Sequence, residues 1–241
     1  MSTPETLANI FFEPGRTFEA LRARPRFLIA TLLMAVVATI FIVVFFTKIN
    51  YADMVRASIE DSPRADQMTD EQKEQAIEMQ SKPFVKAIWY ASPLIGSFLV
   101  LAVGAGIYLL GVMAMGKQMS YGQALAVWAY SSFPPFLLVT LANIIMLYVS
   151  PPDVSEAATA ARGLIHANLG VLVNRTEQPV LATALGQFDL FKIYGLFLAA
   201  IGLRKVARLS AGSAWTVVIV ITLIGAAAAL IFAAVSGQAM A

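Results

Sequence analysis

Long apolar runs alternate with polar connections along this chain. Five runs carry almost no charge: Phe27–Thr47, Ile88–Met115, Ala124–Val149, Leu185–Leu203 and Ala214–Val235. A helix of the first run's length spans about 31 Å, close to the hydrocarbon thickness of a bilayer and well beyond a signal-peptide core. Backbone groups in lipid must bond within their own segment, so each run should be helical. The pattern predicts an all-α integral membrane bundle with five transmembrane helices over 27–241.

Composition supports a lipid environment and excludes several kinds of site. The chain is 59% hydrophobic and 13% charged, whereas soluble domains are about a quarter charged. It has a net charge of +2, no cysteine and a single histidine, His166. These numbers argue against nucleic-acid binding, disulfides and a histidine or cysteine metal site. The H-E-x-x-H, G-x-S-x-G and P-loop patterns are absent, so we expect no cofactor and no enzymatic activity.

The distribution of basic residues predicts orientation. Four arginines precede the first run, Lys117 lies in the short connection 116–123, and three more basic residues lie in the short connection 204–213. With five spans, all of these fall on one side, and the acidic residues concentrate in the long loops opposite. Short loops rich in Lys and Arg stay in the cytoplasm. We therefore expect a bacterial inner-membrane protein with a cytoplasmic N-terminus and an extracytoplasmic C-terminus.

The N-terminal segment 1–26 combines aromatic and basic side chains. Candidate contacts with the lipid surface are Arg16, Phe18, Arg22 and Arg24, because rings beside arginines suit a helix lying on anionic lipid. The alternative is a positively charged flank of the first span without a separate role.

A candidate polar cluster comprises Asp189, Lys192 and Asn143. Asp189 and Lys192 are the charges inside the fourth run, about one and two turns from its start, and their spacing lets them pair on one helix face. Asn143 lies toward the same side in the third run. Charge within the hydrocarbon is costly and often functional, so the cluster is either a structural anchor of the helix end or a functional polar site.

Two further features concern helix shape and packing. Pro134 and Pro135 interrupt the third run and predict a kink there, because proline lacks an N–H and clashes with the preceding turn. In the last run Gly225 and Ala229 form a small-xxx-small pair, which permits close approach of another helix within the bundle or from a second copy.

The long connections also contain helical patterns. Thr69 and Gln72 form a capping box that predicts a helix over Asp70–Gln80. Apolar residues recur at helical spacing in Ser155–Asn168, so this segment lies at the interface, dips into the membrane, or forms an apolar loop helix packed on the bundle.

Three stretches taken in order resemble the Yip (Ypt/Rab-interacting protein) membrane family in its short bacterial form. They are Pro14-Gly15-Arg16-Thr17-Phe18 with Pro25; Gly116 and Ser120-Tyr121 followed by Tyr130-Ser131-Ser132-Phe133-Pro134; and Asp189-Leu190-Phe191, Gly202-Leu203, Ser210 and Ala214. One departure is Tyr194, where members of the family often have Trp. The resemblance implies five spans with a cytoplasmic N-terminus.

The resemblance also bears on function. Eukaryotic relatives act in vesicle traffic and bind Rab-type GTPases through a longer cytosolic N-terminal region than the 26 residues found here. The resemblance therefore implies neither GTPase binding nor a catalytic residue. We expect a non-enzymatic protein for membrane organisation or an adaptor, with membrane lipids, other membrane proteins or itself as partners. The alternative is a carrier or pore for lipid or a small solute, and an intramembrane enzyme ranks third.

Overall fold

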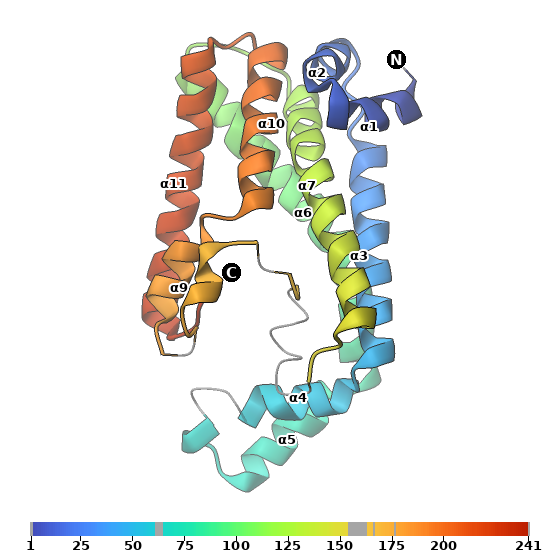
Figure 1. Cartoon of the computed structure of the whole chain (residues 1–241), viewed down its shortest axis with the longest axis vertical. Helices are drawn as coiled ribbons and strands as arrows, with labels where there is room; N and C mark the ends of the chain where they lie inside the picture. Colours follow the sequence, from blue (N-terminus) through green and yellow to red (C-terminus); the bar gives the residue numbers. More distant parts are fainter. Residues whose placement is uncertain (1, 61–64, 154–162, 166, 176, 241) are drawn as a thin grey trace. The chain divides into compact units, whose positions relative to one another are not determined.

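The structure is a computed structural model that describes all residues except 1, 61–64, 154–162, 166, 176 and 241 (Figure 1). The described residues form α-helices, two short 3-10 helices and their connections. Their only strand-like pairing is an isolated antiparallel bridge between Asn168 and Asp189. The predicted all-α class is confirmed.

Four of the described helices are long and apolar enough to cross a membrane. They are α3 (Leu28–Lys48), α6 (Pro83–Ala114), α7 (Tyr121–Val149) and α11 (Ala211–Ser236). The fifth predicted span is not confirmed, because its apolar run is divided between α9 (Pro179–Gly186) and α10 (Leu190–Val206), which has 17 residues.

The other helices of the described residues are short. They are α1 (Thr3–Phe12), α2 (Pro14–Ala23), α4 (Tyr51–Glu60), η1 (Ala65–Gln67), α5 (Asp70–Gln80) and η2 (Leu169–Leu172). The capping box predicted for α5 is confirmed: the Thr69 side chain accepts from the Gln72 backbone, and the Gln72 side chain accepts from the Thr69 backbone. These two bonds satisfy N–H groups that the first turn of a helix leaves unpaired.

The chain divides into two compact units, and the first comprises Met1–Met34, Ser97–Leu137 and His166–Ala241. Within it α10 and α11 lie side by side, and α9 packs on α11 (Figure 1). Helix α2 packs on α10 at Gly202, where an added Cβ would lie 3.0 Å from the Phe18 ring. Because glycine has no side chain, the ring reaches the α10 backbone and is fully buried.

The second unit comprises Ala35–Gly96 and Leu138–Ile165. Its core includes Phe45, Tyr51 and Leu147. The Tyr51 hydroxyl donates to the backbone carbonyl of Gln80 at 2.9 Å, which ties the start of α4 to the end of α5. Most of the predicted helix Ser155–Asn168 lies outside the described residues, so its interfacial or re-entrant position stays a prediction.

Candidate functional site

Asp189 is the N-cap of α10. Its Oδ1 accepts a hydrogen bond of 2.9 Å from the backbone N–H of Lys192, and its backbone is extended. A carboxylate in this position satisfies an unpaired N–H and interacts favourably with the helix dipole. The sequence placed Asp189 about one turn inside a helix that begins at Leu185. That placement is corrected: the helix begins at Leu190, because the side chain caps the first turn.

Lys192 bonds to the amide of Gln187. Its Nζ donates to Gln187 Oε1, and Gln187 Nε2 donates to the Thr183 carbonyl at 3.1 Å. The predicted side-chain pairing with Asp189 is also corrected, since no salt bridge joins these two described side chains. Asp189 instead accepts a hydrogen bond from the backbone N–H of Lys192, and Gln187 accepts one from the Lys192 ammonium.

The break between α9 and α10 is held by the segment that precedes η2. The backbone N–H of Leu190 donates to the carbonyl of Ala167 at 3.0 Å, and Asn168 Oδ1 accepts from the backbone N–H of Gly170 at 2.9 Å. A Cβ at Gly170 would come within 2.8 Å of the Ala182 carbonyl. Glycine thus allows η2 to pack against the backbone of α9, which fixes the position of Asn168 beside the break.

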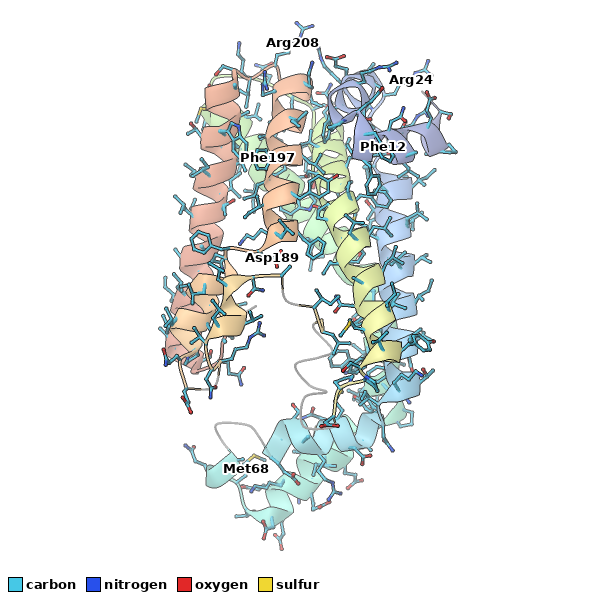
Figure 2. All side chains as sticks on the ribbon, viewed as in Figure 1. Phe12, Arg24, Met68, Asp189, Phe197 and Arg208 are labelled. Atoms are coloured by element: carbon cyan, nitrogen blue, oxygen red, sulfur yellow. The ribbon has the colours of Figure 1, made fainter. Side chains whose placement is uncertain are left out.

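A cavity of about 450 Å³ opens at this break, and we call it the α9–α10 cavity. Its polar lining consists of Asn168, Gln187, Asp189 and Lys192. Figure 2 labels Asp189 at the connection that leads into α10. The sequence identified the two charged residues but missed Asn168 and Gln187 as their neighbours, because nothing in the chain's pattern indicates that η2 folds back onto α9.

The wall formed by α11 is built from small residues. Gly225 and Ala229 line the cavity, and an added Cβ at Gly225 would have no atom within 4 Å. Gly225 therefore faces open space here and not another helix of this chain, and approach of a second copy to this pair stays a prediction. Residue size on this face of α11 helps to set the volume of the cavity.

Asn143 bonds within the second unit. Its Nδ2 donates to the Val139 carbonyl at 2.8 Å, and its Oδ1 accepts from the backbone N–H groups of Leu164 and Ile165 at 2.5 and 2.7 Å. The amide thus anchors the end of the long connection that follows α7 to α7 itself. Its predicted participation in a cluster with Asp189 and Lys192 stays a prediction.

Helix α7 is assigned as helix through both Pro134 and Pro135. The hydroxyl of Ser131 donates to the Trp128 carbonyl at 3.1 Å, whereas the buried Tyr130 hydroxyl has no partner among the described residues. The kink predicted at the prolines stays a prediction.

The N-terminal helices pack on one end of the first unit. Phe18 is fully buried against α10, so its predicted contact with the lipid surface is wrong, and it acts as an anchor of α2. Arg16 is exposed and bonds to Glu13 at 2.7 Å, and Arg24 lines a cavity of about 220 Å³ with Arg26. A sequence with an aromatic ring among arginines is compatible with a helix on the lipid surface and with a helix packed on the protein. Here the Phe18 ring packs against Gly202, so the second arrangement applies.

An ion pair also joins α2 to α10. Lys205 Nζ lies 2.5 Å from Glu19 Oε1. The hydrogen bond and the positive charge of Lys205 lower the pKa of the Glu19 carboxyl below its ordinary value. Both side chains are exposed, so the pair positions α2 more than it stabilises the fold.

These features define the class of the protein: it is an integral membrane protein built from apolar helices, with short polar helices at their ends. The family model of the Yip1 domain matches residues 8–234, nearly the whole chain, and the protein belongs to this family. The resemblance drawn from the three sequence stretches is thereby confirmed. No curated protein and no solved structure matches the chain in the corresponding searches.

Proposed function

We propose that this protein organises the membrane as a non-enzymatic adaptor for other membrane proteins. The proposal rests on family membership together with a basic surface at one end of the first unit, formed by Arg16, Arg22 and Arg24 of the N-terminal segment with Arg204 and Arg208. Figure 2 labels Arg24 and Arg208 at this end. We call these five residues the basic end.

The basic end is supported by a firmly attached helix. Phe18 packs on Gly202, and Glu19 pairs with Lys205. A surface presented on such a helix loses little conformational freedom on binding, which favours a defined partner. Arginine side chains there suit anionic lipid headgroups or acidic segments of a neighbouring protein.

In the proposed topology the basic end faces the cytoplasm of a bacterial inner membrane. Helices α9 and α10 together form the fifth crossing, which supports an extracytoplasmic C-terminus. Helix α10 alone has 17 residues, about 26 Å of helix, slightly short of a hydrocarbon core of about 30 Å. Residues of α9 would complete the crossing, as in the interrupted helices that membrane proteins tolerate where the backbone lines a cavity.

Co-purification tests the adaptor role. The protein would be solubilised from its own membranes with lipids retained, and bound proteins would be quantified for the natural chain and for an Arg22→Gln/Arg24→Gln variant. We expect a defined membrane protein that is retained by the natural chain and released by the variant. A Lys73→Gln/Lys82→Gln variant, altered in the outer loop, should retain it. Equal recovery from all three chains would contradict a role of the basic end.

A carrier for lipid or a small solute is the second candidate. The observation that favours it is the α9–α10 cavity, which places Asp189 and Lys192 beside an apolar helix. A flux of lipid or small solute across the membrane of proteoliposomes that changes on Asp189→Asn would support the carrier role over the adaptor role.

A further inference from the structure

The α9–α10 cavity lies deep along the apolar helix α11. Gly225 follows Ala211 by 14 residues, which corresponds to about 21 Å of helix, and Lys192 precedes Val206 by the same interval. If both helices start near one membrane surface, both residues lie about two thirds of the way through a hydrocarbon core of about 30 Å. In that placement the polar residues of the cavity lie inside the hydrocarbon core.

Both charged side chains at this depth keep unused bonding capacity. The ammonium of Lys192 has three donors, and Gln187 Oε1 accepts one of them. Asp189 uses Oδ1 as the helix cap, and Oδ2 has no hydrogen-bond partner among the described residues. Charges in apolar surroundings are normally paired and hydrogen-bonded. A ligand that offers an anionic oxygen to Lys192 and an N–H donor to Asp189 would satisfy both.

We propose that the α9–α10 cavity binds a phospholipid headgroup that carries a phosphate and a primary ammonium, as phosphatidylethanolamine does. The phosphate is bound by Lys192 and the ammonium by Asp189. The amide of Asn168 lines the same space and supplies a further polar contact.

Charge balance distinguishes this headgroup from others. One cation and one carboxylate match a zwitterion, whereas an anionic headgroup offers no positive charge to Asp189. A choline headgroup has the same net charge but no N–H to donate. A volume of about 450 Å³ falls within the range of small-ligand sites.

The acyl chains have a path along α11. Gly225 and Ala229 leave open space at the cavity, and Phe232, on the same face of the helix, is half exposed. A lipid can reach the site laterally from the bilayer, whereas a free solute would have to cross apolar surface. This inference is independent of the adaptor role, because it involves neither the basic end nor a protein partner.

Native mass spectrometry of the full chain tests the proposal. Delipidated protein would be titrated with phosphatidylethanolamine, phosphatidylcholine or phosphatidylglycerol, and with soluble glycerophosphoethanolamine. We expect one phosphatidylethanolamine bound more tightly than the other three. Lys192→Gln and Asp189→Asn should each weaken its binding about tenfold, as for the loss of a charged hydrogen bond. Asparagine also caps helices, so the second variant retains the start of α10.

Two further variants separate the site from unfolding and from general charge effects. Gly225→Leu fills the cavity without altering charge, and it should also release the lipid. Lys117→Gln removes an exposed lysine in the α6–α7 connection and should bind as the natural chain does. Equal binding by Lys192→Gln, Gly225→Leu and the natural chain would overturn the proposal. Tighter binding of phosphatidylglycerol, equal binding of phosphatidylcholine, or equal binding of glycerophosphoethanolamine would also overturn it.

Discussion

Replacing Gly104 by alanine should destabilise the protein, because the new methyl group has no space. An added Cβ at Gly104 would lie 2.2 Å from Cε2 of Trp128, whose ring is packed 4.8 Å from that of the buried Tyr108. Ordinary contact begins near 3.4 Å, so the indole would have to move by more than 1 Å. Overpacking of this kind costs about 1–3 kcal/mol.

Gly106 provides a matched control. It lies in the same helix, and an added Cβ there would have nothing within 4 Å. Both substitutions gain the same helix propensity, so the difference between them reports the clash with Trp128. At about 2–4 °C per kcal/mol, Gly104→Ala should melt about 2–12 °C below Gly106→Ala in a detergent thermal-shift assay.

A compensating change makes the test sharper. Trp128→Leu removes the ring that the new methyl group would strike, so Gly104→Ala should be less harmful in that background than in the natural chain. Equal melting temperatures for Gly104→Ala and Gly106→Ala would refute the close packing of α6 on α7 where Gly104 meets Trp128.

Four other predictions follow from the same structure. A reporter fused after Ala241 should be extracytoplasmic, and a cytoplasmic signal would contradict the fifth crossing. Asp189→Asn should be mild and Asp189→Leu should cost about 0.5–2 kcal/mol in a detergent melt, because asparagine caps a helix and leucine does not; equal melting would contradict the capping role. Asn143→Leu should destabilise by about 1–3 kcal/mol, because two backbone N–H groups lose their acceptor, and unchanged stability would argue against this anchor. The lowered pKa of Glu19 means that its pairing with Lys205 contributes fully above the ordinary value of 4.5 and is lost as the pH falls through the folded-state pKa. Acidification to well below pH 4.5 should therefore loosen α2 in hydrogen exchange, and a Lys205→Met variant should not show this dependence.

Hydropathy and capping signals predicted the elements that local sequence determines. Four apolar runs became helices able to cross a membrane, and the helix Asp70–Gln80 begins at its capping box as expected. These features depend on residues close together in the chain. Whether an apolar run favours lipid over water, and whether a side chain can cap the first turn of a helix, can be judged without knowledge of the fold.

The features that were missed depend on contacts between distant segments. The mean hydropathy of the fourth run does not reveal that the run contains a break between two helices, after which the Asp189 side chain caps the first turn of α10. Phe18 could be assigned correctly only with knowledge that Gly202 lies opposite it. The ammonium of Lys192 bonds to Gln187 because the chain turns between α9 and α10. Spacing along an uninterrupted helix had instead indicated Asp189 as its partner.

In-cell photo-crosslinking most directly tests the claim that the basic end contacts another membrane protein. A photoreactive amino acid would replace Ala23, which is exposed between Arg22 and Arg24, and a control would carry it at Gln238 on the proposed outer side. We expect a defined membrane-protein adduct from position 23 that is absent from position 238 and that is lost in the Arg22→Gln/Arg24→Gln background. Adducts that are the same at both positions, or that survive loss of the two arginines, would contradict it.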